Sequence, residues 1–344
     1  MNPPFLTPDH VHHGLAQDLL DRVEPGSVAL SVWSPPYFVG KSYEKELTYE
    51  DWLALLQTVI AKHQPVLKPG GFLAINIADI LCFSDESIPR FQAENLTGNR
   101  LSVTRDDILQ VLAAEPELDR YQIAKKLGVS EQTVDRRLKN NNVRGGKYAA
   151  QTRVNLVGGI LEDAAYDAGL YLYDRRVWVK DPCWENSRWH TNSYRAVDEF
   201  EYVYIFWKPG ITTVNREKLS REEWVEWGSR AVWSIPSVRA NDDHEAKFPL
   251  ELPRRLIRLL TEPGDVVLDC FLGSGTSAVA ARLEGRRYIG FEKEERYAAL
   301  ARQTIAAVIP PTHPEAGSGR GRAGKPPRTR KAAGRATDTL FPID

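Results

Sequence analysis

With 344 residues, 42% of them hydrophobic and 26% charged, the chain has the length and composition of a globular protein of one large domain or two, which excludes a disordered chain. Its three cysteines, Cys82, Cys183 and Cys270, are an odd number without metal-ligand spacing, so we expect a reduced cytoplasmic protein with no metal site. No apolar run approaches the length of a membrane span and no signal peptide is recognisable, so we expect no membrane association.

The formal net charge of −1 conceals an uneven distribution of charge. The segment 100–147 is net basic, and the chain after Pro311 consists mainly of Pro, Gly, Ala, Arg and Lys. We expect residues 310–344 to form a disordered basic tail. Local basic surfaces matter more than net charge for binding a polyanion, so nucleic acid remains a candidate partner.

The first predicted elements form a β-α-β unit. An apolar run over residues 27–33 predicts a buried strand, residues 50–64 predict a helix, and residues 72–77 predict a second strand. The pattern then stops after Asp79. Residues 84–150, helical from about residue 104, are interpreted as an insertion.

Strands and helices alternate again after this insertion. We expect helices near 154–168, 249–260 and 277–284, and strands near 170–179, 201–207, 265–270 and 288–292. The alternation predicts a doubly wound, mostly parallel α/β sheet. Residues 1–83 and 151–309 would be two parts of that domain, separated by the helical insertion at 84–150.

The sequence Ser34-Pro35-Pro36-Tyr37 stands at the carboxyl end of the first strand. Two consecutive prolines lack N–H groups and have a fixed φ, so they stiffen the turn and leave its carbonyls free to accept hydrogen bonds. The Ser34 oxygen and a proline carbonyl can accept from the exocyclic amino group of a planar ring that stacks on Tyr37. The alternative is a proline turn that merely ends a strand.

A strand followed by a glycine-rich turn and a helix is predicted over residues 265–284. Gly273 and Gly275 allow a tight turn and a close approach of a ligand, and Glu292 ends the next strand, where an acid can bind ribose hydroxyls. A nicotinamide dehydrogenase shares this pattern. Here, however, the pattern begins only at residue 265, so one more strand and helix can follow before about residue 310 and the rest of the sheet must come from earlier residues. The strand that ends at Ser34 should therefore lie beside this strand, in the crevice where open α/β sheets bind ligands.

The two motifs together resemble those of the S-adenosylmethionine-dependent DNA amino-methyltransferases. Ser34-Pro35-Pro36-Tyr37 comes first and the Asp-x-Phe-x-Gly-x-Gly-Thr sequence at 269–276 comes last, which is the order of their β group. This order implies a Rossmann-like methyltransferase fold with circularly permuted motifs. Four further segments are similar to the family, namely 69–76, 197–208, 233–236 and 244–249.

The resemblance implies that S-adenosylmethionine is the cofactor. The residues implied at its methionine end, in the same pocket and at its ribose are Asp269, Phe271, Gly273, Ser274, Gly275, Thr276, Lys247, Phe248, Pro249 and Glu292. The residues implied to hold a flipped base are Ser34, Pro35, Pro36 and Tyr37.

Hydrogen bonds from the amino group to Ser34 and to a backbone carbonyl would favour a pyramidal nitrogen with an available lone pair. Family members with serine at the first position usually methylate cytosine N4, and those with aspartate usually methylate adenine N6. The resemblance therefore favours N4-cytosine, with N6-adenine as the alternative. A carbon-5 cytosine enzyme needs a cysteine after proline, and Pro182-Cys183 lacks the supporting pattern.

Residues 121–140 are similar to a helix-turn-helix, in which Gly128 ends the first helix and Ser130 caps the second. The second helix would present to a major groove the side chains of Gln132, Thr133, Arg136, Arg137 and Asn140. A helical packing insert or a protein contact is the alternative, and a non-enzymatic helix-turn-helix regulator is the alternative function.

The loop 184–195 mixes aromatic residues with Arg188 and Arg195, which suits stacking and phosphate contacts, although tryptophans packed on one another would explain it equally well. Double-stranded DNA is thus the expected partner. A restriction endonuclease acting on the same site and a second copy of the chain are further candidates. The expected setting is the nucleoid of a bacterial or archaeal cytoplasm.

Overall fold

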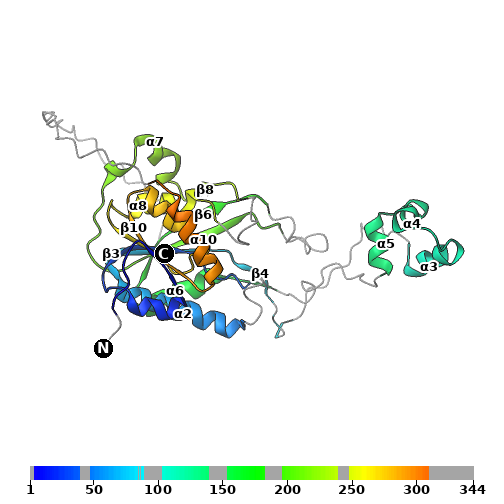
Figure 1. Ribbon diagram of the computed structural model, residues 1–344, viewed down its shortest axis with the longest axis horizontal. Helices are drawn as coiled ribbons and strands as arrows, with labels where there is room; N and C mark the ends of the chain where they lie inside the picture. The colour runs from blue at the N-terminus through cyan, green and yellow to red at the C-terminus, as the bar shows by residue number, and fades with distance from the viewer. Residues whose placement is uncertain are drawn as a thin grey trace, which may run out of the picture. The chain divides into compact units, whose positions relative to one another are not determined.

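A single large sheet forms the centre of the computed structural model, which describes residues 4–38, 47–83, 85, 87–88, 103–138, 153–182, 196–238 and 248–309 (Figure 1). Within these ranges eight strands are hydrogen-bonded in the order β1 (His10–His13), β10 (Arg287–Glu292), β9 (Val266–Asp269), β2 (Val28–Trp33), β3 (Leu67–Ile77), β7 (Phe200–Trp207), β6 (Tyr171–Val179) and β8 (Val232–Ser234). Every neighbouring pair is parallel except the two that involve β7. The predicted doubly wound, mostly parallel sheet is confirmed.

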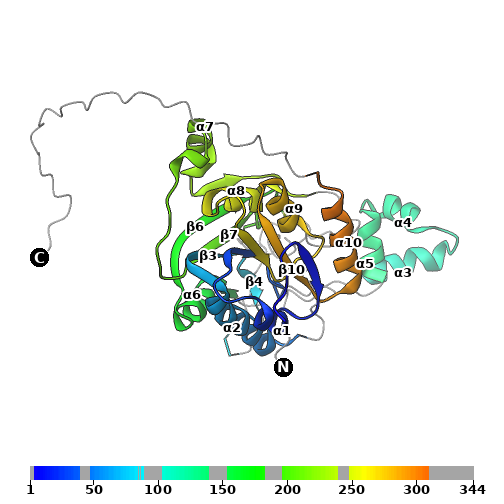
Figure 2. The same ribbon diagram turned by 60° about the vertical axis from the view of Figure 1, so that its left-hand side comes forward.

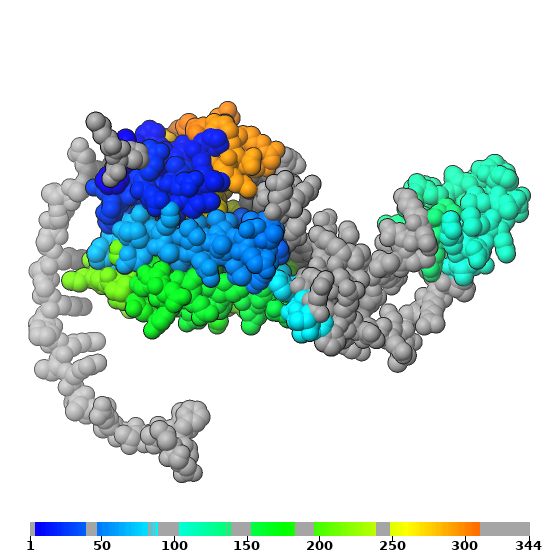
Figure 3. Space-filling model, turned by 90° about the horizontal axis from the view of Figure 1, so that it is seen from below, coloured from blue at the N-terminus to red at the C-terminus, as the bar shows by residue number. Residues whose placement is uncertain are grey.

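Helices cover both faces of the sheet (Figure 1, Figure 2). The first face carries α1 (Ala16–Leu19), η1 (Leu20–Arg22), α2 (Tyr49–Val66) and α6 (Val157–Asp167). Figure 3 looks onto this face, where the N-terminal residues in dark blue, α2 in lighter blue and α6 in green lie side by side. The second face carries η7 (Trp224–Gly228), α8 (Glu251–Leu260), α9 (Thr276–Leu283) and α10 (Glu295–Ala306).

Alternation along the strands divides the core between these two faces. On β3, Leu73 and Ile75 join the cluster under α2 and α6, whereas Phe72 and Ala74 join the cluster under α8. All four side chains are almost completely buried, because helices pack on both faces of the sheet. The apolar content of this strand therefore reflects its central position.

The turn that leads into the buried part of β3 requires a glycine. Gly70 has a φ of 78°, and a Cβ atom there would lie 2.2 Å from the Ile211 carbonyl oxygen. β3 begins at Leu67, which pairs with Val28, and not near residue 72 as predicted. Residues 68–71, which lie before the predicted strand, thus belong to the strand itself.

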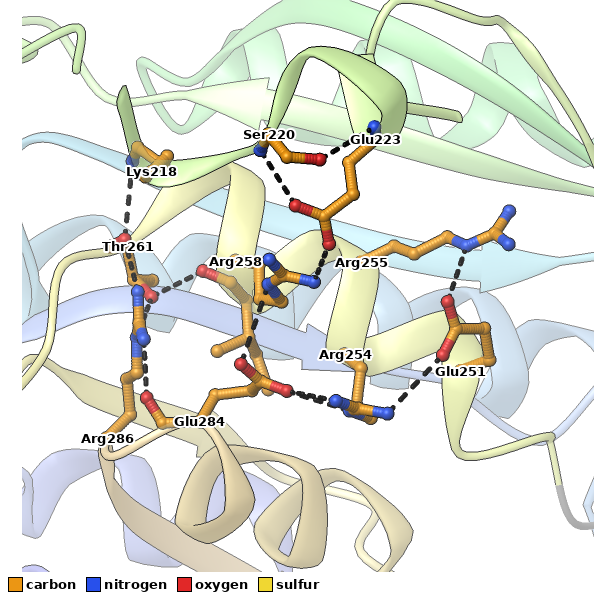
Figure 4. Close-up of polar contacts among 11 residues, drawn as sticks. Lys218, Ser220, Glu223, Glu251, Arg254, Arg255, Arg258, Thr261, Glu284 and Arg286 are labelled. Carbon is orange, nitrogen blue, oxygen red and sulfur yellow. Dashed lines mark hydrogen bonds and ion pairs between the residues drawn. The ribbon is translucent and has the colours of Figure 1, made fainter. Parts of the chain in front are cut away.

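Ion pairs connect α8 to the elements around it (Figure 4). Arg254 Nη2 lies 2.6 Å from a Glu284 carboxylate oxygen just after α9, and Arg258 bonds to Glu223 of the short helix α7 (Arg221–Glu223). The 3-10 turn η6 (Arg216–Lys218) precedes α7, and its Lys218 donates to the Thr261 carbonyl. This network lies on the covering helices and holds α8 in place over the sheet.

Three helices within the predicted insertion form a core of their own. These are α3 (Arg105–Ala114), α4 (Arg120–Leu127) and α5 (Glu131–Leu138), which enclose Ile108, Ile123 and Val134. Gly128 ends α4 with a φ of 67°, and the Thr133 amide donates to Ser130 Oγ at the start of α5, as predicted for a stop and a cap.

A small two-stranded sheet closes the insertion at its base. β4 (Ile80–Phe83) pairs with β5 (Arg153–Asn155), so Phe83 and Arg153 face each other on either side of the segment 84–150. The sequence did not predict this pair, nor the short strands β1 and β8. Residues 310–344, predicted as a basic tail, lie outside the described residues. No helix in the described ranges has the length and hydropathy that a bilayer crossing requires.

Candidate active site

Ser34 follows the last residue of β2 and lies at the carboxyl edge of the sheet. β2 runs between β3 and β9, and Ser31 pairs with Leu268 of β9 in parallel register. The residues after β2 and the glycine turn after β9 therefore emerge at the same edge. This neighbouring position of the two strands is the arrangement predicted from the late position of the glycine turn in the chain.

The Ser34 hydroxyl belongs to a directed hydrogen-bond network. Ser34 Oγ lies 2.9 Å from the Tyr37 hydroxyl and 3.0 Å from the Asn76 carbonyl oxygen. The Tyr37 hydroxyl lies 2.7 Å from Glu201 Oε2. An ionised carboxylate can only accept, so Tyr37 donates to Glu201 and Ser34 donates to Tyr37 or Asn76. Ser34 Oγ keeps lone-pair capacity with which it can accept from a bound group.

The two proline carbonyls differ in their partners. Trp52 Nε1 donates to the Pro36 carbonyl oxygen over 2.7 Å, which anchors the turn to α2. No donor among the described residues is hydrogen-bonded to the Pro35 carbonyl oxygen. Of the two proline carbonyls, that of Pro35 is therefore the one that we expect to accept from the amino group of a bound base.

The turn after β9 strongly favours glycine at its last position. Gly273 and Gly275 have φ values of 55° and 98°, and α9 begins directly after them at Thr276. A Cβ atom on Gly275 would also lie 3.2 Å from Cα of Ala301 in α10. The backbone conformation and the packing of α10 both select glycine here.

Two buried carboxylates line this turn. Asp269 accepts from the Phe271 amide at 2.9 Å and from the Ser277 hydroxyl, and Glu292 accepts from the Gly273 amide at 2.8 Å. Burial raises the pKa of Asp269 to about 7, despite the bonds from Ser277 and Phe271. Each carboxyl oxygen can accept more than one hydrogen bond. The pair suits a ligand with hydroxyl groups and a positive charge.

A buried histidine, His63, is hydrogen-bonded to two residues of β2, the strand that leads to Ser34. His63 Nδ1 donates to the Val59 carbonyl at 2.6 Å, while Nε2 lies 2.8 Å from Ser31 Oγ and 3.3 Å from Trp33 Nε1. Burial lowers the pKa of His63 to about 4, so the imidazole is neutral at physiological pH. Trp33 in turn packs edge-on against Phe271 of the glycine turn.

The remaining predicted site residues are placed unevenly. Phe248 packs against the core cluster that also holds Leu272 of the glycine turn, and Pro249 is buried just before α8. Ser274 is buried in the turn itself. On α5, Gln132 is exposed, whereas the Thr133 hydroxyl is bonded to Ser130.

The other residues predicted to contact DNA include Arg136 and Arg137 of α5. Arg137 of α5 is partly buried, and nothing is described of the Arg136 side chain. The residues that lie outside the described ranges are Asn140, Cys183, Arg188, Arg195 and Lys247. Among the described residues, no three His, Cys, Asp or Glu side chains gather as they would around a metal ion.

Sequence reasoning missed three residues of the Ser34 network, namely Asn76, Lys180 and Glu201. Glu201 is an acid near the start of an otherwise apolar strand, which is a signal that could have drawn attention. Ser277, the partner of Asp269, was missed as well. An alanine-rich helix start gave no reason to single it out.

Known proteins match this chain over most of its length. The sequence model of a DNA methylase family matches residues 28–303. The type II methyltransferase M.BglI of Bacillus subtilis is 62% identical over 304 residues, which cover 88% of this chain and 87% of the relative.

The fold of this chain is also similar to that of solved structures. The Thermus thermophilus protein TTHA0409, solved in complex with S-adenosyl-L-methionine, is 25% identical, with a TM-score of 0.57 over 86% of this chain and 93% of its own. The PvuII DNA methyltransferase, which is cytosine-N4-specific, is 17% identical, with a TM-score of 0.53 over 88% of this chain and 91% of its own.

Proposed function

The chain belongs to the N6/N4 family of DNA methylases and uses S-adenosylmethionine as its methyl donor, and on this premise we propose that it methylates the exocyclic N4 of cytosine in double-stranded DNA. The observation that carries the proposal is Ser34 at the edge of β2, with its hydrogen committed to Tyr37 or Asn76 and its oxygen left as an acceptor. Serine in this motif, through the family resemblance, favours cytosine over adenine.

Each residue of the motif would hold a different part of the target cytosine. The N4 amino group would donate one hydrogen to Ser34 Oγ and the other to the Pro35 carbonyl, while the ring stacks on Tyr37. These bonds favour a pyramidal nitrogen, whose lone pair can then point at the methyl group. The bound cofactor supplies a methyl group already activated on a sulfonium. Orientation and electrostatics, without a covalent enzyme intermediate, would then account for catalysis.

The cofactor pocket would be built around the glycine turn. Asp269, with its raised pKa, would be returned to the ionised form by a positively charged ligand. Glu292 would accept from ribose hydroxyls. The remaining residues proposed for the pocket are Phe271, Gly273, Ser274, Gly275, Thr276, Lys247, Phe248 and Pro249.

The target base would have to leave the duplex to reach Ser34, which costs a few kcal/mol, offset in part by stacking on Tyr37. We assign recognition of the site to the helical insertion, with DNA contacts from Gln132, Thr133, Arg136, Arg137 and Asn140, and from Arg188 and Arg195. The type II designation of the Bacillus subtilis relative supports a cognate endonuclease as a functional partner.

Mass spectrometry of nucleosides tests the proposal directly. The purified protein is incubated with isotopically labelled S-adenosylmethionine and a mixture of DNA sequences, and the DNA is then digested. Labelled N4-methylcytosine is the expected product. Labelled N6-methyladenine alone would reject the choice of cytosine, and sequencing of the methylated DNA would identify the recognition site.

A further inference from the structure

Glu201 is a buried acid that the methyl-transfer chemistry described above does not use. It is 7% exposed and lies near the start of β7. β7 is antiparallel to β3, with Asn76 paired to Val203, so its start reaches the sheet edge at which β3 ends. Glu201 thus lies at the same edge as Ser34, and the Tyr37 hydroxyl connects the two side chains.

Both oxygens of this carboxylate have short, specific partners. Oε2 accepts from the Tyr37 hydroxyl at 2.7 Å, and Oε1 lies 2.7 Å from Lys180 Nζ. Lys180 is itself mostly buried, and its ammonium also lies 3.4 Å from Asp198. The Lys180 ammonium compensates the charge of this carboxylate, whose oxygens can accept hydrogen bonds but cannot donate them.

This acceptor sets the direction of the bonds that follow. The Tyr37 hydrogen points to Glu201, so the Tyr37 oxygen and the Asn76 carbonyl are both left to accept from Ser34. The Asn76 carbonyl lies 3.3 Å from the Tyr37 hydroxyl, so without Glu201 Tyr37 would compete for it. Ser34 with its hydrogen committed can only accept from a bound base.

We propose that Glu201, paired with Lys180, is a positioning residue that orients the Tyr37 and Ser34 hydroxyls so that the site accepts an amino group and rejects a carbonyl oxygen. The proposal rests on the proposed function. At the position where cytosine carries its amino group, uracil and thymine carry an oxygen that needs a donor. Ser34 has no hydrogen to offer that oxygen, so the same geometry that holds the amino group excludes these bases.

The isosteric change Glu201→Gln is the first test. The glutamine amide can donate to the Tyr37 oxygen, so the Tyr37 hydrogen turns towards Ser34. The Ser34 oxygen then accepts from Tyr37 and has less capacity to accept from a bound base. We expect kcat to fall by about ten- to a hundredfold, as for the removal of a charge-assisted hydrogen bond, and S-adenosylmethionine affinity to change by less than about twofold. Glu199→Gln, an exposed acid two positions away, is the matched control and should retain full activity.

A binding readout separates orientation from stability. Duplexes carry cytosine or uracil at the target position identified by sequencing, and their affinities are measured without turnover. The preference of the wild-type protein for cytosine over uracil should shrink by about tenfold in Glu201→Gln. A merely structural role would weaken both duplexes equally.

Two further variants keep the test decisive. Lys180→Met combined with Glu201→Gln removes both charges of the Lys180–Glu201 pair, so it avoids an ammonium that has lost its nearer carboxylate if the single variant folds poorly. In a Tyr37→Phe background, Glu201→Gln should lower kcat by less than about twofold more, because the link to Ser34 is already broken. Unchanged kcat and base preference in Glu201→Gln, or fully multiplicative losses, would overturn the proposal. A wild-type protein that methylates no DNA would instead reject the proposed function.

Discussion

Ser34 is the residue whose loss should separate catalysis from binding most clearly. Ser34→Ala removes the acceptor oxygen but leaves the prolines and the Tyr37–Glu201 bond in place. We expect kcat to fall by about a hundredfold, comparable to the removal of one electrostatic interaction with a reacting group, with little change in S-adenosylmethionine affinity. Single-turnover methylation and equilibrium cofactor binding measure the two effects.

Ser27→Ala is a suitable control for this experiment. Ser27 precedes the other end of β2, and its hydroxyl bonds to the Glu24 carbonyl, far along the strand from the site. It should retain wild-type activity. Equal losses in the two variants would mean that β2 is disturbed as a whole and that Ser34 has no specific role.

His63 makes folding stability depend on pH. Its pKa is about 4 in the folded chain and about 6.5 when unfolded, so between these values only the unfolded chain takes up the proton. The stabilising effect of the neutral imidazole is therefore complete above pH 6.5 and is lost as the pH falls towards 4. At about pH 5 we expect the loss of this contribution to lower the unfolding free energy by about 2 kcal/mol.

Urea unfolding at about pH 7.5 and about pH 5, compared between the wild-type protein and His63→Leu, isolates this contribution from that of Asp269, whose raised pKa acts in the opposite direction. His63→Leu should show a smaller loss of unfolding free energy between the two pH values than the wild-type protein. His10→Gln, at an exposed histidine, should keep the wild-type loss. The same pH dependence in His63→Leu and the wild-type protein would contradict the assignment.

At the scale of elements, the glycine turn after β9 is under the strictest constraint. Gly275→Ala would place a side chain at a φ of 98° and against Ala301 of α10. We expect a loss of about 2–3 kcal/mol in unfolding free energy, together with weaker cofactor binding. Thermal unfolding with and without S-adenosylmethionine measures both.

Gly159→Ala provides the comparison within a helix. Gly159 lies in α6, and a Cβ atom there would have no heavy atom within 4 Å. Alanine is the better helix former, so this variant should be as stable as the wild-type protein or gain up to about 1 kcal/mol. A Gly275→Ala protein that behaved like Gly159→Ala would show that the turn tolerates a side chain.

The elements that the sequence predicted well are those with strong local signals. The apolar run of β2, the glycines after β9 and Gly128 at the end of α4 each define a boundary by themselves. β1 and β8 lack such signals, since they have four and three residues and are held by pairing with neighbouring strands. Tertiary pairing, not local propensity, makes them strands.

The same distinction holds for the site. Ser34, Gly273 and Gly275 could be singled out because proline and glycine constrain the backbone in a way that the sequence displays. Glu201 and Lys180 could not, because their role depends on an antiparallel register that places β7 beside β3 and β6. The hydrogen bonds that connect Glu201, Tyr37 and Ser34 follow no fixed spacing in the sequence, so no sequence pattern reveals them.

On the scale of the whole molecule, the order of the sheet explains how distant parts of the chain form one site. The strand before Ser34 is the fourth in the sheet and the strand before the glycine turn is the third, although more than half of the sequence separates them. The helices α3, α4 and α5 lie in the sequence between β4 and β5, which pair with each other. The apolar core of these helices shares no residue with the two clusters that cover the sheet.

This separation predicts that the insertion can be removed without loss of the α/β body. Replacing residues 100–147 by a short flexible linker should leave S-adenosylmethionine affinity unchanged, because Phe83 and Arg153 already face each other at the base. Selection of a particular DNA site should be lost, since the residues proposed to read the groove are gone. Sequencing of DNA methylated by the two proteins compares their site preferences.

A milder variant guards against a general effect of the deletion. Gln132→Ala with Arg137→Ala leaves the buried residues Ile108, Ile123 and Val134 of the insertion intact. If α5 reads the groove, this variant should relax the site preference, at about 1–3 kcal/mol for each base that the helix no longer reads. An unaltered methylation pattern after deletion would place recognition on the α/β body, because that is the part of the chain that both proteins share.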